Sequence, residues 1–254
     1  MNSTESQKFW HYRYMFYFDG ARGRMHYRRW PVDNAVATAA LLPGLGQHSG
    51  HYHRFARSLG AAGIRLWALD TFGHGLSEGD PLHPGTLAEL VADATAFLDR
   101  VRAEAAGPLV LMGHSLGAVT ALGTLGAAVP DISAGTDLNT VEASYPLTPS
   151  VPHEALAGLV LSGVPRRALG GGRPDAPGTP LPSTLPILAV HGTDDRRAPV
   201  EAMREWAGRH PWARWHEYAD TGHDVLHEPR YAEVTADVVA WLLERAHSAA
   251  AASR

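Results

Sequence analysis

Short apolar runs alternate along this chain with longer amphipathic stretches, and few folds accommodate such an alternation. A run that is apolar nearly throughout is typical of a strand that is covered on both faces, as strands of a parallel sheet are. Stretches with apolar residues three and four positions apart indicate helices that pack against that sheet. The alternation therefore predicts an α/β fold with a mostly parallel central sheet and helices on both faces.

The expected elements follow one another along the chain. Strands are predicted at Ala35–Leu42, Ile64–Leu69, Leu109–Met112, Leu159–Ser162, Ile187–Val190 and Trp215–Tyr218. Helices are predicted at His51–Ala62, Thr86–Ala105, Leu116–Leu125, Val200–Gly208 and Pro229–Ala246. The segments Tyr12–Phe18 and Met25–Trp30 flank the turn residues Asp19-Gly20 and Arg22-Gly23. This pattern predicts an antiparallel hairpin at one edge of the sheet.

Two segments interrupt the alternation. Val129–Glu154 contains four prolines and shows little periodicity, and nine of the 21 residues in Val164–Thr184 are glycine or proline. Neither segment is compatible with a continuous regular helix. We interpret both as loops inserted near the site of a single domain that spans residues 1–254. Residues 129–154 are either a solvated loop or a cover over the site, and their scattered apolar residues favour the solvated loop.

Composition excludes several classes of function. The formal charge is -4, with 26 acidic and 22 basic residues, so no nucleic acid or anionic membrane is expected as a partner. The absence of cysteine excludes thiolate metal sites and a cysteine nucleophile. The single lysine, Lys8, leaves no internal lysine for a phosphate loop or a Schiff base. Residues 1–10 lack the charged start and apolar run that are typical of a secretory signal, and no stretch approaches the roughly 18 to 20 consecutive apolar residues of a membrane span. A cytoplasmic location is therefore predicted.

The strongest chemical signal is Gly113-His114-Ser115-Leu116-Gly117. It follows a predicted strand directly and precedes a predicted helix, which is the context of a nucleophile elbow. The two glycines leave room for a very sharp turn, and the turn projects the hydroxyl of Ser115 beyond the sheet. We therefore interpret Ser115 as a catalytic nucleophile, with an ordinary glycine-rich turn as the alternative.

A serine nucleophile requires a histidine base and an acid that orients it. Asp194 and Asp195 follow one predicted strand, and His223 follows the last one, so both loops lie at the strand ends where open α/β sheets gather their sites. Asp195 is the preferred acid, with Asp194 as its rival, and His223 is the preferred base. His114 is expected to pack beside the nucleophile. The sequence also contains a cluster of histidines at His48, His51, His53 and His74. No nearby acidic run or two-turn helix presents it as a metal site, and no metal is predicted.

The tetrahedral intermediate needs hydrogen-bond donors for its oxygen anion. Leu45, in the loop after the strand Ala35–Leu42, and Leu116, directly after the serine, are predicted to supply backbone N–H groups. The same loop resembles a dinucleotide-binding fingerprint, but its third glycine lies at position 50 instead of 49. No cofactor is predicted.

Motifs along most of the chain resemble the monoacylglycerol lipase and lysophospholipase branch of the α/β-hydrolase superfamily. They are Phe18-Asp19-Gly20, residues 44–50, residues 70–79, the Ser115 elbow, residues 191–195, and residues 222–229. The resemblance implies that Ser115 is the nucleophile, Asp195 the acid and His223 the base, with the N–H groups of Leu45 and Leu116 as the oxyanion hole.

Two departures from that family bear on the substrate. Pro43 stands where relatives usually have histidine, and the short polar segment 164–184 replaces a helical cap of several dozen residues. An open site would suit a bulky or carrier-bound acyl group as well as a monoglyceride. The sequence thus predicts a serine hydrolase of a small-molecule ester or thioester, without stable membrane insertion. A biosynthetic enzyme for elimination, cyclisation or acyl transfer, and a non-catalytic small-molecule binder, remain alternatives. The sequence leaves the oligomeric state open.

Overall fold

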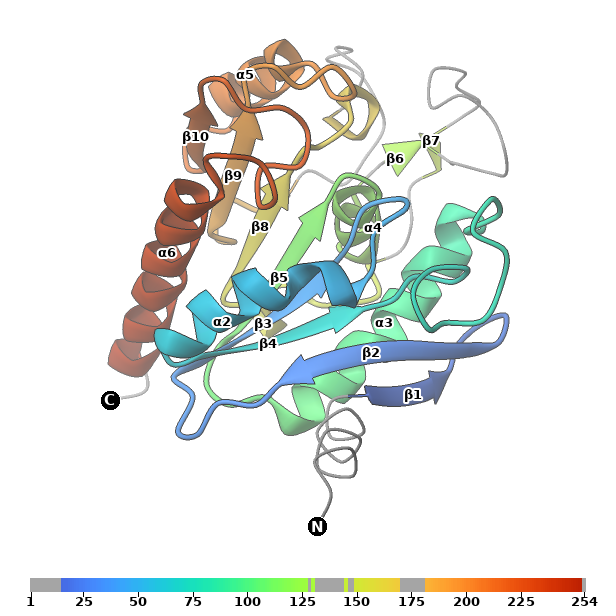
Figure 1. Ribbon diagram of the computed structural model, residues 1–254. Coiled ribbons are helices and arrows are strands. Elements are labelled where there is room, and N and C mark those ends of the chain that lie inside the picture. Colours follow the sequence, from blue (N-terminus) through green and yellow to red (C-terminus); the bar gives the residue numbers. More distant parts are fainter. Residues whose placement is uncertain (1–14, 128, 131–143, 146–148, 170–180, 253–254) are drawn as a thin grey trace.

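The fold is built on an eight-stranded sheet with the strand order β1-β2-β4-β3-β5-β8-β9-β10 (Figure 1). The structure is a computed structural model that describes residues 15–127, 129–130, 144–145, 149–169 and 181–252. The strands of this sheet are β1 Met15–Asp19, β2 Arg24–Trp30, β3 Ala37–Leu42, β4 Ile64–Leu69, β5 Leu109–His114, β8 Gly158–Ser162, β9 Ile187–Gly192 and β10 Arg214–Tyr218. Every predicted strand is therefore present, with its ends shifted by a few residues.

Most strand pairs are parallel, as predicted. Within this eight-stranded sheet, antiparallel pairing is limited to β1 with β2 and β2 with β4, which places the predicted hairpin at the edge of the sheet. Strand β3 lies between β4 and β5, so the chain leaves β3 toward one side and later returns on the other. Such a switch point opens a crevice at the carboxyl ends of the strands, where open α/β sheets bind their ligands. The register aligns these ends, since Leu42 pairs with Gly113 and His114 pairs with Ser162.

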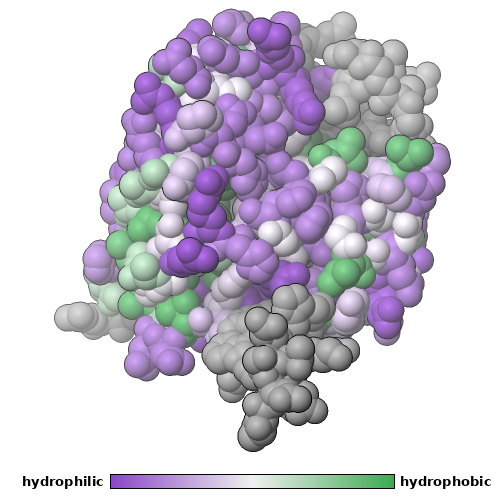
Figure 2. Space-filling view, in the orientation of Figure 1, coloured by the Kyte–Doolittle hydropathy of each residue, from purple (hydrophilic) through white to green (hydrophobic). Residues whose placement is uncertain are grey.

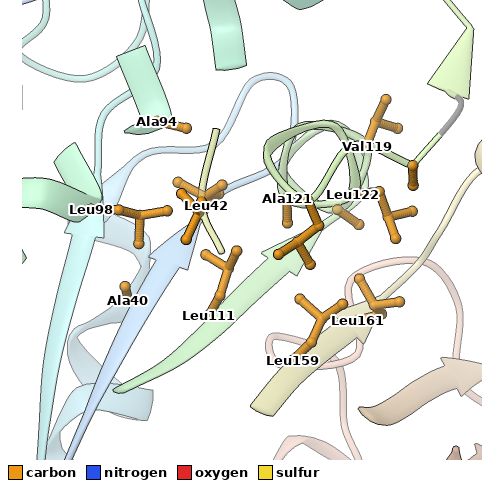
Figure 3. Packing of buried hydrophobic residues seen from close by; sticks show 14 of the residues in the cluster. Ala40, Leu42, Ala94, Leu98, Leu111, Val119, Ala121, Leu122, Leu159 and Leu161 are labelled. Carbon is orange, nitrogen blue, oxygen red and sulfur yellow. The ribbon is translucent and has the colours of Figure 1, made fainter. Parts of the chain in front are cut away.

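Helices cover both faces of the sheet. They are α2 His53–Ala61, α3 Leu87–Glu104, α4 Leu116–Thr124, α5 Val200–Arg209 and α6 Tyr231–Ala252. Helices α3, α4 and α5 pack on one face in one core cluster, whereas α2 and α6 pack on the other face in a second cluster. Figure 3 shows part of the first cluster, in which leucines of β3, β5 and β8 meet apolar residues of α3 and α4. Hydrophobic residues gather over α6 on the visible face, whereas much of the rest of that face is hydrophilic (Figure 2).

The helix ends differ slightly from the prediction. The predicted helix His51–Ala62 begins with a 3-10 turn, η1 Ser49–Tyr52, before α2. Helix α3 begins after Thr86, whose hydroxyl accepts from the Glu89 N–H while the Glu89 carboxylate accepts from the Thr86 N–H. This capping box explains the helix start. None of the described helices is long and apolar enough to cross a membrane.

The two irregular segments contain short elements. Strands β6 Val129–Pro130 and β7 Ser144–Tyr145 pair antiparallel, and η2 His153–Ala155 and η3 Arg166–Leu169 are 3-10 turns. The rest of 129–148, apart from these strands, and residues 170–180 lie outside the described residues, as do residues 12–14 of the predicted hairpin. The choice between a solvated loop and a cover for residues 129–154 therefore stays a prediction.

Candidate active site

Ser115 occupies a sharp turn between β5 and α4. Its φ of 50° and ψ of -114° lie in a region that non-glycine residues rarely adopt, and such strain persists only where the surrounding structure enforces it. The Ser115 N–H donates to the Ser162 carbonyl at 2.9 Å, which fixes the turn to β8. A Cβ atom at Gly113 would lie only 2.5 Å from the Gly117 carbonyl oxygen, so the turn requires glycine there. The local geometry is that of the predicted nucleophile elbow.

The structure pairs His223 with Asp195. His223, in the loop after β10, has its Nδ1 atom 2.7 Å from Oδ2 of Asp195, in the loop after β9. The other carboxylate oxygen of Asp195 accepts from the N–H groups of Arg197 and Ala198, each at 2.8 Å. Asp194, the rival acid, is exposed and accepts a hydrogen bond from the Thr193 hydroxyl instead. The geometry therefore favours Asp195 as the orienting acid.

The charge on Asp195 fixes the tautomer of His223. Burial raises the pKa of Asp195, but hydrogen bonds from His191, His223 and the Ala198 N–H outweigh burial and hold that pKa well below its usual range. Because the carboxylate is ionised, His223 Nδ1 carries a proton and donates it. In the neutral imidazole, Nε2 is then left with a free lone pair, which is the state that a general base requires.

His223 lies beside the elbow. Its ring centroid is 4.9 Å from that of His114, the residue that precedes Ser115. A Cβ atom at Gly163, which follows the Ser162 carbonyl that holds the elbow, would lie 3.0 Å from Cε1 of both histidine rings. Within the described part of the chain, the Ser115 hydroxyl has no hydrogen-bond partner. Serine–histidine bonds are often long or poorly aligned before substrate binds, so this contact stays a prediction.

The loop after β3 lies against the elbow. A Cβ atom at Gly44 would lie 3.2 Å from Cβ of Ser115, and one at Gly117 would lie 2.7 Å from the Pro43 carbonyl oxygen. Among the described residues, the N–H groups of Leu45 and Leu116 have no hydrogen-bond acceptor. Two free donors on neighbouring segments match the predicted oxyanion hole, and Pro43 removes only its own donor.

A second polar pair lies beneath this site. His114 is buried, with Nε2 3.1 Å from Oδ1 of Asp224 and Nδ1 3.2 Å from the Ser162 hydroxyl. Gln47 donates to the same Asp224 oxygen at 2.7 Å. From the sequence, His114 is expected only to pack beside the nucleophile, and no role is predicted for Gln47 or Asp224. Their one sequence signal is that each stands within two residues of a predicted site residue.

Burial and pairing set the charges of this second pair. Burial lowers the pKa of His114, and the opposing effect of Asp224 does not overcome it. The hydrogen bond from His114 lowers the pKa of Asp224. At neutral pH the pair is therefore a neutral imidazole and a carboxylate, and the carboxylate lies next in sequence to His223.

Residues 70–79 hold the neighbouring loops in place. Asp70 accepts hydrogen bonds from the N–H groups of Ser49 and Leu76 at 2.6 and 2.9 Å, and from His26 Nδ1 at 2.7 Å. Burial raises the pKa of Asp70, but these hydrogen bonds outweigh burial and lower that pKa overall. Gly75 is required because a Cβ atom there would meet the Asp70 carboxylate. This block therefore connects β2 to the loops after β3 and β4.

One set of side chains lies close enough to share a metal ion. Among the residues that the structure describes, ligand atoms of His114, His223 and Asp224 lie within 4.8 Å of one another, whereas the cluster of His48, His51, His53 and His74 forms no such set. A zinc ion requires nitrogen or oxygen ligands at about 2.0 to 2.2 Å. Since two of the three groups are already hydrogen-bonded and a third pairs with Asp195, the set fits a hydrogen-bonded network better than a metal centre.

Known proteins resemble this chain in sequence. The family described as "Serine aminopeptidase, S33" matches residues 33–136. The chain is 29% identical to the monoacylglycerol lipase of Mycolicibacterium smegmatis over an alignment 272 positions long, gaps included, which covers 89% of this chain and 95% of that protein. It is also 33% identical to the monoglyceride lipase of Homo sapiens over 97 residues, which cover 37% of this chain and 32% of that protein.

Solved structures resemble the chain in fold. The structure of a soluble variant of monoglyceride lipase from Saccharomyces cerevisiae, in complex with a substrate analog, superposes with a TM-score of 0.67 at 15% identity. The superposition covers 91% of this chain and 94% of that chain. This likeness confirms the fold class that the sequence predicts.

Proposed function

We propose that the chain is a member of the monoacylglycerol lipase-like branch of the α/β-hydrolase superfamily and that it cleaves a carboxylic ester or thioester through an acyl-enzyme on Ser115. The M. smegmatis relative, whose name is monoacylglycerol lipase, aligns along most of both chains and supports ester hydrolysis as the reaction class. The proposed substrate is a small-molecule acyl ester or thioester.

In the first half of the reaction, the Ser115 hydroxyl attacks the acyl carbonyl carbon while His223 Nε2 takes the hydroxyl proton. Asp195 holds His223 Nδ1–H and stabilises the imidazolium that forms. The carbonyl oxygen becomes an anion, which the N–H groups of Leu45 and Leu116 stabilise. His223 then passes the proton to the leaving alcohol or thiol, and the acyl group remains on Ser115.

In the second half, water replaces the leaving group. His223 Nε2 takes a proton from water, the hydroxide attacks the acyl carbon, and the same two N–H groups stabilise the second tetrahedral intermediate. The proton returns to Ser115 as the carboxylic acid leaves. These reaction steps use the side chains of Ser115, His223 and Asp195, the two backbone N–H groups and water.

One observation carries the proposal. Ser115 has a positive φ at the end of β5, between two glycines and beside a histidine that donates to a buried, ionised aspartate. Strained backbone of this kind requires the surrounding structure to maintain it, and it is common where a side chain must be presented to a substrate.

The decisive test is covalent labelling of Ser115. We expect a fluorophosphonate probe to add one adduct to the wild-type protein, located on Ser115, because the probe reacts with serines that a base activates. Ser115→Ala removes the adduct and lowers esterase kcat by about 10⁶, the loss typical of a missing triad nucleophile. Intact mass, peptide mapping and turnover of a short-chain ester measure these outcomes.

The matched control is Ser58→Ala on the exposed face of α2, where the hydroxyl donates only to the Arg54 carbonyl. It should keep both labelling and turnover. Hydrolysis in ¹⁸O-labelled water should place the label in the acid product, which separates hydrolysis from elimination. An unlabelled wild-type protein, or full turnover by Ser115→Ala, contradicts the proposed function.

A further inference from the structure

Gln47, Asp224 and His114 connect three of the four loops that carry the proposed catalytic groups, namely those after β3, β5 and β10. We propose that Gln47, through its hydrogen bond to Asp224, holds the oxyanion loop, residues 43–47, in register with the nucleophile and the base. Gln47 is thus a positioning residue for the reaction. The inference rests on the proposed hydrolase function and adds a residue to which neither the family resemblance nor the triad assigns a role.

Both the nitrogen and the oxygen of the Gln47 side-chain amide form hydrogen bonds. Its Nε2 donates to Asp224 Oδ1 at 2.7 Å, and its Oε1 accepts from the Tyr52 hydroxyl and, at 3.4 Å, from the Gly44 N–H. Because Asp224 only accepts and Tyr52 and Gly44 only donate here, a single orientation of the amide satisfies all three contacts. Burial raises the pKa of Tyr52, which keeps its hydroxyl protonated as a donor.

The network continues from Asp224 to the elbow. Asp224 is a carboxylate and His114 is neutral, so His114 donates through Nε2–H to Asp224 and accepts through Nδ1 from the Ser162 hydroxyl. The Ser162 carbonyl, in turn, accepts from the Ser115 N–H. A line of hydrogen bonds, together with the covalent structure of Ser162, thus connects the Gln47 amide with the backbone of the nucleophile.

The nucleophile, the base and the oxyanion donor Leu45 each lie within two residues of a member of this line. His114 precedes Ser115, Asp224 follows His223, and Gln47 stands two residues after Leu45. The residues that form the line are far apart in the chain, since Gln47 and Asp224 are separated by 177 positions and His114 and Asp224 by 110. The line is therefore a tertiary connection between the loops after β3, β5 and β10.

The oxyanion loop needs such a connection. Leu45 is 48% exposed, and the Gly44–Gln47 turn closes on itself through the Gln47 N–H and the Gly44 carbonyl at 3.0 Å. This turn fixes the local shape of the loop but not its distance from Ser115. The Gln47 side chain supplies that restraint, because it ties the same turn to the loop that carries His223. A shift of about 1 Å in such a donor is enough to lower a rate by about 100-fold.

The test uses Gln47→Met, which keeps the length of the side chain and removes its hydrogen bonds. We expect kcat for a short-chain ester to fall about 10- to 100-fold while KM changes little, because the loss affects the oxyanion rather than the ground state. The inhibition constant of a trifluoromethyl ketone should rise by the same factor, since its hemiketal oxygen occupies the oxyanion hole. Tyr52→Phe removes one donor to Gln47 and should give a smaller change in the same direction.

The matched control is Thr38→Val at the opposite end of β3. Thr38 is buried, and its hydroxyl donates to the Ala106 carbonyl at 2.9 Å and accepts from the Ala106 N–H at 3.0 Å. The variant therefore loses buried hydrogen bonds on the same strand, far from the strand's carboxyl end. It should lower the melting temperature and leave kcat and the ketone inhibition constant unchanged.

The outcomes separate this inference from the proposed function. A parallel loss of kcat and ketone affinity in Gln47→Met, without the loss in Thr38→Val, supports a positioning role. Unchanged kcat and ketone affinity, or a rise in KM alone, overturns it. If the wild-type protein itself neither hydrolyses esters nor reacts with fluorophosphonate, the proposed function is contradicted, whatever Gln47→Met shows.

Discussion

Gly113→Ala should separate the strand–turn–helix geometry from the chemistry that it supports. A Cβ atom at position 113 would lie 2.5 Å from the Gly117 carbonyl oxygen, 2.6 Å from the Ala118 Cα and 2.7 Å from the Ala118 nitrogen. Carbon atoms prefer separations of about 3.5 to 4.0 Å, so α4 must move about 1 Å away from β5. All three atoms are backbone, and no side-chain rotation relieves the contact.

The displacement has two measurable costs. Overpacking of a buried site destabilises a protein by about 1 to 3 kcal/mol, which corresponds to a fall of about 2 to 12 °C in melting temperature for a chain of this size. Ser115 connects β5 to α4 and Leu116 begins α4, so the nucleophile and one predicted oxyanion donor move as well. A misplacement of about 1 Å lowers the rate by about 100-fold.

Circular dichroism during heating measures the melting temperature, and turnover of a short-chain ester measures kcat. Gly208→Ala in α5 is the control, because a Cβ atom there meets nothing within 4 Å and alanine favours the helix. It should keep its activity and unfold at the wild-type temperature or slightly above. A Gly113→Ala protein with wild-type melting temperature and kcat within threefold of wild type would refute this reasoning.

Two further predictions concern the buried carboxylates. Asp195→Asn should lower kcat by about 10⁴, because an asparagine side chain no longer selects the required His223 tautomer. The kcat of Asp194→Asn should stay within twofold of wild type. The reverse result would make Asp194 the acid. The pKa of Asp70 is lower in the folded protein than in the unfolded chain, where it is about 4. Above the unfolded pKa, ionised Asp70 therefore stabilises the native state. This stabilisation is lost as the pH falls through the folded pKa. In urea unfolding from pH 7 to pH 3, the stability advantage of wild type over Asp70→Asn should therefore shrink, and a constant difference would contradict the assignment.

Local patterns predicted most of the architecture. The strands from Ile64–Leu69 to Ile187–Val190 were predictable because a run that is apolar nearly throughout is typical of a strand covered on both faces, and such a run is visible in a few consecutive residues. The elbow was predictable for the same reason, since Gly113 and Gly117 stand on either side of the strained residue. The start of α2 was harder to place, because a 3-10 turn precedes the helix and both conformations suit the same residues.

The sequence by itself determined which loops carry the candidate chemistry, because each candidate residue stands shortly after a strand that local sequence patterns predict. Only the tertiary structure shows that the His223 ring reaches Asp195 and not Asp194, since that contact is made across two loops. It also revealed Gln47 and Asp224 as partners of each other. Their hydrogen bond spans 177 positions, and no local pattern records which side chains meet when two distant strands end at the same edge of a sheet.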